Sequence, residues 1–216
     1  MNQFVRCLSV GAAAFALSAA QDYRFSEPPQ AVEPEGPIQA VVLHPIFADY
    51  FNCGEHPAGE ESIVGDALGT DCQIVGGVFG ENRSFARQFR TDGKTNADWF
   101  SWQKDVLAPI DGVVTGLFPN AKVNEPGQRG KPPAAMIQIT RDDGLVVVLA
   151  HVTDFAIKLD QRVKAGDVVA KVGNNGPSYA PHVHVGAYRG VEPLQIRWDQ
   201  RAAGKLYKKL ESPAGQ

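Results

Sequence analysis

The chain has 216 residues, of which 44% are hydrophobic and 21% charged, and its formal net charge is −3. This composition is that of a globular protein with enough apolar residues for one sizeable core. So small a net charge gives no electrostatic reason for nucleic acid or an anionic membrane as the main partner, and we expect no nucleic-acid binding. The 22 glycines and 15 prolines favour turns and short strands over long helices.

Residues 1–20 have the pattern of a secretory signal peptide. Arg6 supplies the positive charge, residues 8–17 form a short apolar stretch, and small residues at 18–20 precede a cleavage site. The stretch is shorter than the roughly 20 residues that span a bilayer, although an uncleaved anchor is the alternative. No other run approaches transmembrane length, so the sequence predicts an exported protein, periplasmic or extracellular, that is not an integral membrane protein.

Two cysteines, Cys53 and Cys72, remain after the signal peptide. An even pair in an exported chain favours a disulfide, and this spacing fits no zinc-binding pattern. The closed loop would have about twenty residues and would contribute ~3 kcal/mol on the chain-entropy model. Residues 21–80 are therefore interpreted as an N-terminal extension held by this disulfide, which begins with an arm rich in Pro, Glu and Gln up to about residue 37.

Short apolar segments separated by turn residues continue along the chain, and a turn at residues 142–144 marks a hairpin. Their regular spacing predicts a mainly β protein with an antiparallel sheet and few short helices. We assign residues 81–195 to this domain and 196–216 to a C-terminal tail, with one short helix at about 202–210. Strands or buried segments are expected at 41–51, 74–79, 106–109, 111–114, 136–140, 145–151, 168–172 and 182–188.

Three histidines stand out by position. His182 and His184 are two residues apart in a predicted strand, so their side chains point to the same side. Two imidazoles on one face commonly form a metal or acid–base site, the alternative being two surface histidines on a half-exposed strand. His151 ends an earlier apolar strand and indicates nothing by itself.

Four sequence motifs follow one another in order: Val106-Leu-Ala-Pro-Ile-Asp-Gly-Val-Val, Leu149-Ala-His-Val, Val163-Lys-Ala-Gly-Asp-Val-Val-Ala-Lys-Val-Gly-Asn-Asn-Gly and Pro181-His-Val-His-Val. Together they resemble the M23 family of zinc metallopeptidases, the lysostaphin or LytM type, over about residues 83–189. The last two are the most specific. The first also occurs in biotinyl and lipoyl barrels, but the turn at 141–144 lacks the lysine that those carriers need.

The resemblance implies a groove on an antiparallel, barrel-sandwich-like sheet that cuts peptide bonds in peptidoglycan. In the family one zinc ion is held by a His and an Asp about four residues apart, together with the second His of a His-x-His. Carried over to this chain, His184 is the metal ligand. His151 and His182 are the catalytic pair, which stabilises the developing oxyanion or orients the attacking water.

The first pair of ligands is missing from the expected place. One register puts Ser84 and Gln88 at these positions, and neither side chain binds zinc well. A shorter register offers Asp98 as a substitute carboxylate, with Lys94 where the histidine should be. Two other sources of ligands are conceivable: His44 or His56 from the N-terminal extension would reach the groove, or the three downstream histidines would bind a metal alone.

The sequence therefore favours an exported cell-envelope protein of the M23 fold with an incomplete zinc site. Such a protein would bind peptidoglycan or its stem peptides, or regulate another envelope hydrolase. The alternative is an active zinc-dependent endopeptidase with non-standard ligands. The aromatic cluster at residues 99–102 is interpreted as core packing, with stacking on glycan or peptide as its alternative.

Overall fold

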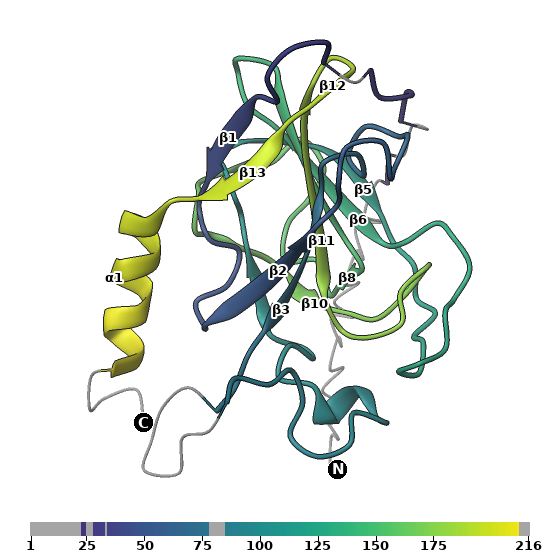
Figure 1. Ribbon diagram of the computed structural model, residues 1–216, viewed down its shortest axis with the longest axis vertical. Coiled ribbons are helices and arrows are strands. Elements are labelled where there is room, and N and C mark those ends of the chain that lie inside the picture. Colours follow the sequence, from purple (N-terminus) through teal and green to yellow (C-terminus); the bar gives the residue numbers. More distant parts are fainter. Residues whose placement is uncertain (1–22, 25–27, 33, 78–84, 212–216) are drawn as a thin grey trace, which may run out of the picture.

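The computed structural model describes residues 23–24, 28–32, 34–77 and 85–211. The signal-peptide prediction falls outside these residues. The described part of the chain is mainly β, with one 3₁₀ turn and one α-helix, which confirms the predicted fold class (Figure 1). None of the helices in these ranges is long and apolar enough to cross a membrane.

The largest sheet contains strands in the order β2-β3-β11-β7-β6-β5-β9, and β12 pairs with β11 at the side. All of its pairings are antiparallel. Its strands are β2 (Phe51–Glu55), β3 (Thr70–Ile74), β5 (Gly112–Phe118), β6 (Met136–Thr140), β7 (Leu145–Ala150), β9 (Arg162–Val163), β11 (Val183–Arg189) and β12 (Glu192–Pro193).

Two smaller sheets complete the β-structure. One is antiparallel, in the order β4-β10-β8, and the other pairs β1 with β13 in parallel. Figure 1 shows α1 following β13 at the side of the molecule. The bounds are β1 (Ala40–Leu43), β4 (Asp105–Leu107), β8 (Val152–Thr153), β10 (Val168–Val172), β13 (Gln195–Trp198), the 3₁₀ turn Asn96–Asp98 and α1 (Gln200–Glu211).

The core lies on one face of the large sheet. Alternate residues of each strand point to it, because neighbouring side chains in a strand face opposite ways. In β7, Leu145, Val147 and Leu149 are fully buried, whereas the residues between them are at most partly exposed on the other face. The second face of the sheet is therefore free to carry a polar groove.

The N-terminal extension joins this sheet. Its strands β2 and β3 form a hairpin whose β3 pairs with β11. Cys53 and Cys72 face each other in this hairpin and form the predicted disulfide, with their Cα atoms 4.1 Å apart. The expected strand at 74–79 is in fact β3, which ends at Ile74. The hairpin places extension residues beside the histidine-bearing strand.

Candidate metal and catalytic site

Strand β11 presents His184 to the groove face of the sheet. Val183, Val185 and Ala187 on this strand lie in the core, so the intervening residues point the opposite way. His184 is only 4% exposed. The groups around it therefore decide whether its imidazole binds a metal or is a buried polar group that only makes hydrogen bonds within the protein.

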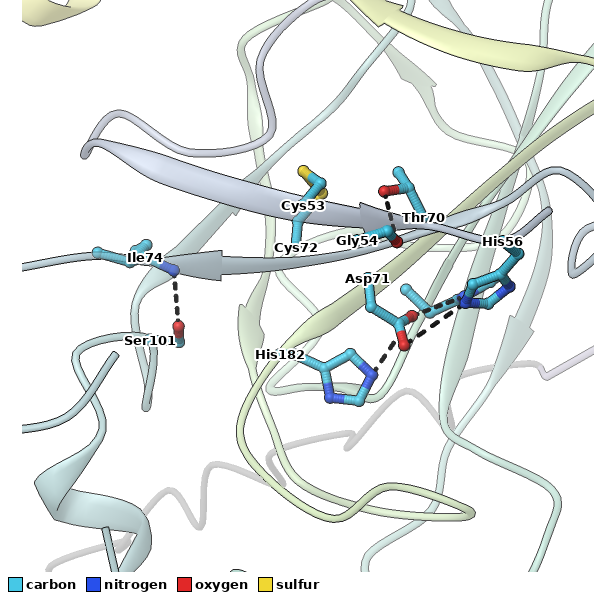
Figure 2. The surroundings of a disulfide bond; sticks show 10 residues. Cys53, Gly54, His56, Thr70, Asp71, Cys72, Ile74, Ser101 and His182 are labelled. Carbon is cyan, nitrogen blue, oxygen red and sulfur yellow. Dashed lines mark hydrogen bonds and ion pairs between the residues drawn. A yellow bond between two sulfur atoms is a disulfide. The ribbon is translucent and has the colours of Figure 1, made fainter. Parts of the chain in front are cut away.

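Asp71 lies directly opposite His184 in the pairing of β3 with β11. Its Oδ1 is 3.0 Å from Nδ1 of His184, and its Oδ2 is 3.6 Å from Nε2 of His56, which follows β2. One ligand atom each from His56, Asp71 and His184 can be chosen so that all lie within 4.8 Å of one another. Figure 2 shows the Asp71 carboxylate pointing away from the hairpin, between His56 and His182. Two imidazoles and a carboxylate thus converge on one point.

Both ligand histidines are held in the tautomer that a metal needs. Nδ1 of His56 lies 3.2 Å from the carbonyl oxygen of Asp66, and Nε2 of His184 lies 2.6 Å from that of Gly65. A carbonyl oxygen only accepts, so these nitrogens each carry a hydrogen, and the other nitrogen of each ring is the one that would bind a metal after losing its proton. In both rings this second nitrogen is on the side of Asp71. In zinc sites the ligand histidines usually donate their other ring N–H to a backbone carbonyl or a carboxylate, as both rings do here, so this donor set fits zinc.

The charges in the metal-free site are those of a carboxylate among imidazoles. Burial opposes ionisation of Asp71, but hydrogen bonds from His182, His184 and His56 outweigh it and lower the pKa of the carboxyl group. The hydrogen bond with Asp71 is the main cause that raises the pKa of His56 to about 9. Burial opposes protonation of His184, yet Asp71 raises the pKa of this residue too. A cation is therefore favoured at this point, whether it is a proton or a metal ion.

His151 and His182 form a second pair beside the first. Their ring centroids are 4.5 Å apart, and Nε2 of His182 is 3.6 Å from Oδ1 of Asp71. Nδ1 of His151 donates to the carbonyl of Asn175 at 2.7 Å, and Nδ1 of His182 lies 2.8 Å from the carbonyl of Ala180. Burial lowers the pKa of His151 to about 3, so this imidazole is neutral near pH 7 with a lone pair on Nε2.

The backbone at His151 is in the left-handed region, with φ of 63°. This conformation is uncommon for a residue with a side chain and occurs often at functional sites. Asn175 fixes the ring, because its own amide is held by Ala135 and Val152 through hydrogen bonds of 2.7 and 2.9 Å. The orientation of His151 is therefore determined by several contacts at once.

All five groups line one groove of about 730 Å³. Its floor comes from the groove face of β6, β7 and β11, including Gln138, Val148 and Tyr188. Residues 132–134 and 177–180 form part of its lining, as do residues 63–66. The groove is therefore lined both by segments of the N-terminal extension and by the strands that carry the sequence motifs.

The sequence-predicted site residues divide into two sets. The structure brings together His151, His182 and His184. Asp98 lies elsewhere: its carboxylate accepts backbone N–H groups of Thr91 and Gly93 within its own loop.

The first register offered two positions, Ser84 and Gln88. Ser84 lies outside the described residues, and Gln88 is tied through its backbone carbonyl to the N–H of Phe100 at 3.0 Å. His44 is not part of the cluster, and its Nδ1 lies 2.8 Å from the carbonyl of Pro45. Of the two alternatives in the extension, His56 is the one that reaches the groove.

The pair His56 and Asp71 was missed because the two residues are 15 positions apart in the sequence instead of four. They lie at the loop end of the β2–β3 hairpin, whose connection is a long loop in place of a tight turn. The two cysteines contained the information that could have identified this pair. A disulfide between directly opposed strands pairs Cys53 with Cys72, which puts Gly54 opposite Asp71 and His56 just beyond.

Residues 98–196 match the family model described as Peptidase family M23. No curated protein matches the sequence. Among solved structures, the chain is similar to the catalytic domain of the antimicrobial peptidase lysostaphin from Staphylococcus simulans, at 19% identity over 63% of this chain and 79% of that one, with a TM-score of 0.36.

A catalytic-domain variant of the prophage-encoded M23 protein EnpA from Enterococcus faecalis shares 22% identity over 52% of this chain and 85% of its own, with a TM-score of 0.32. A protein assigned as an M23 peptidase in Pseudomonas aeruginosa shares 20% identity over 47% of this chain, with a TM-score of 0.35. The present chain spans only 39% of the length of that protein.

Proposed function

We propose, from the match of residues 98–196 to the model of peptidase family M23, that the protein is an active zinc-dependent peptidase that hydrolyses peptide bonds in peptidoglycan after export to the cell envelope. The observation that carries the proposal is the convergence of His56, Asp71 and His184 within 4.8 Å. This set has the two imidazoles and one carboxylate of a catalytic zinc site. It replaces the incomplete set expected from the sequence, and the alternative of an active enzyme becomes the better supported one.

His56, Asp71 and His184 would hold the ion, and three protein ligands leave a coordination position open. When bound, zinc polarises a carbonyl and lowers the pKa of a water molecule to near neutrality. The carbonyls of Gly65 and Asp66 keep both imidazoles oriented with the metal-binding ring nitrogen toward the site. The protein thus contributes a preformed ligand set before any metal arrives.

His151 has the properties of a proton acceptor. Its Nδ1–H is committed to Asn175 and its pKa of about 3 keeps it neutral, so only the lone pair on Nε2 is available in the groove. A neutral imidazole in this tautomer accepts a hydrogen bond from a water molecule and orients it. We assign this role to His151. While its ring is neutral, Nε2 carries no hydrogen and cannot donate a hydrogen bond to an oxyanion.

His182 has a role that complements that of His151. Its Nδ1 lies by the carbonyl of Ala180 and within 3.3 Å of the hydroxyl of Ser178, which fixes the ring. Its Nε2 lies toward Asp71 and toward the groove, where a protonated ring would donate to developing negative charge on a substrate oxygen. Accepting and donating groups are therefore supplied by two adjacent rings.

The choice of peptidoglycan and of the envelope rests on the family resemblance and on the signal-like first twenty residues. The groove is lined by small and polar residues, among them Gly116, Ala150 and Gln138. An extended peptide, whose backbone N–H and C=O groups need hydrogen-bond partners, suits a lining of this kind. The stem and bridge peptides of the cell wall are short, extended and exposed, which suits this groove.

The test combines metal analysis with hydrolysis of purified peptidoglycan by the protein that starts at residue 21. We expect one zinc ion per chain and release of new amino groups from the peptidoglycan, both lost with a chelator. His151→Ala and His182→Ala should lower hydrolysis by about 10²–10⁴-fold, the usual contribution of a general acid or base. Both variants should retain zinc. Substoichiometric zinc in protein prepared without chelator, or hydrolysis unaffected by either substitution, would refute the proposal.

A further inference from the structure

The Cys53–Cys72 disulfide joins the two strands that carry the proposed metal ligands. Asp71 immediately precedes Cys72 on β3, and His56 follows Cys53 by three residues, directly after the end of β2. The two cysteines are directly opposed in the register of the hairpin. The covalent bond is therefore placed to determine how far His56 lies from Asp71.

The other restraints on the separation of these two ligands are noncovalent. Residues 57–69 connect them as a long loop, so no tight turn fixes the distance. The last backbone hydrogen bond of the hairpin runs from the N–H of His56 to the carbonyl of Gly69 at 2.8 Å. Strand β2 is an edge strand that pairs only with β3 among the described strands. Besides this ladder, the His56 side is held by hydrogen bonds alone, among them those from Thr70 Oγ1 to the carbonyl of Gly54 at 3.0 Å and from Nδ1 of His56 to the carbonyl of Asp66 at 3.2 Å.

The disulfide lies on the opposite face of the hairpin from the ligands. Side chains alternate along a strand, so Cys72 points into the core when Asp71 points to the groove. Cys72 is fully buried there, and Figure 2 shows the sulfur atoms on the side of the hairpin away from Asp71. The cysteines are therefore not ligands, and they tie the movable edge strand to a strand that is fixed in the core.

We propose that the Cys53–Cys72 disulfide is a positioning element of the metal site, so that zinc affinity depends on the oxidation state of this pair. The inference rests on the proposed zinc-binding function. Oxidation of the two thiols to the disulfide, with loss of two protons and two electrons to a cellular dithiol oxidase or a disulfide reagent, brings His56 and Asp71 into register. Before oxidation, the edge strand samples positions in which the three ligands do not converge. The site is then assembled only in a compartment where disulfides form.

The experiment compares zinc binding by the oxidised wild type with that of two double variants, C53A/C72A and C53V/C72V. Free thiols bind zinc themselves, so the variants replace chemical reduction. The valine pair restores cross-strand packing without the covalent link. Folding is checked by circular dichroism, and zinc affinity is measured by competition with a chromophoric chelator. Cobalt(II) spectra report the coordination geometry directly, which overall stability alone would not alter.

We expect the alanine pair to bind zinc about 10- to 100-fold more weakly than the wild type, the range seen when a group that orients ligands is lost. The cobalt spectrum should change, and the valine pair should recover part of the affinity. The matched control is Val163→Ala, a buried substitution on β9 at the opposite edge of the sheet, which lowers stability without touching the hairpin. It should leave zinc affinity unchanged.

The outcomes separate this inference from the proposed function. Folded variants with the zinc affinity and cobalt spectrum of the wild type would overturn the positioning role while the zinc site stands. An equal loss of affinity in Val163→Ala would also overturn it, because general stability would then explain the effect. If C53A/C72A does not fold, C53V/C72V decides alone. An oxidised wild type that binds no zinc would remove the proposed function itself.

Discussion

Replacing His56 by alanine tests the assignment of the metal site most directly. Zinc sites with four protein ligands bind with about 10–16 kcal/mol, so one ligand accounts for about 2.5–4 kcal/mol. At about 1.4 kcal/mol per factor of ten, His56→Ala should weaken zinc binding about 10²–10³-fold. The imidazole is already oriented by the carbonyl of Asp66, so its ordering adds no cost that would reduce this loss.

Zinc affinity is measured by chelator competition at two pH values. A proton occupies His56 below about pH 9 in the metal-free protein, so the difference between wild type and variant should be larger at pH 9 than at pH 7. The matched controls are His44→Ala, Ser84→Ala and Gln88→Ala, which alter another histidine of the extension and the two positions suggested by the sequence. None of them should change the affinity. A wild-type affinity in His56→Ala, or a weakened one in Ser84→Ala or Gln88→Ala, would refute this ligand set.

Three further predictions concern the same neighbourhood. Zinc binding should release at least one proton near pH 7, because the raised pKa of His56 makes the metal compete with a proton. Zinc affinity should therefore rise with pH by up to about tenfold per pH unit until about pH 9. Calorimetry in buffers of different ionisation enthalpy measures the proton release, and a pH-independent zinc affinity would contradict this prediction. Gly69→Ala should lower zinc affinity about 10- to 100-fold, because the added Cβ would lie 2.7 Å from Cε1 of His184 and 2.8 Å from the carbonyl oxygen of Asp66. Gly54→Ala is the control, because a Cβ added at this position of the same hairpin would meet open space. Equal zinc affinities in the two variants would count against the prediction. Asp98→Asn should lower the melting temperature but leave zinc affinity unchanged, since its carboxylate serves the backbone of Thr91 and Gly93; a loss of zinc would reinstate Asp98 as a ligand.

The sequence by itself determined the β character of the chain and one side of the site. Alternating apolar residues in 145–150 and 183–188 define which face of each strand is buried, and this is a local property of the chain. The same alternation puts His182 and His184 on a common side. The disulfide was also predictable, because an even cysteine pair has few other uses in a chain whose first twenty residues predict export.

Only the tertiary structure decided which residues complete the site. His56 and Asp71 meet because β3 pairs with β11 in the register that puts Asp71 opposite His184, and because the loop 56–69 returns the chain from β2 to β3. Loop length changes the sequence spacing of two ligands without changing their distance in space, since strand pairing and the Cys53–Cys72 bond set that distance. A search for a His and an Asp four residues apart depends on spacing alone, and it therefore could not find a pair separated by a long loop.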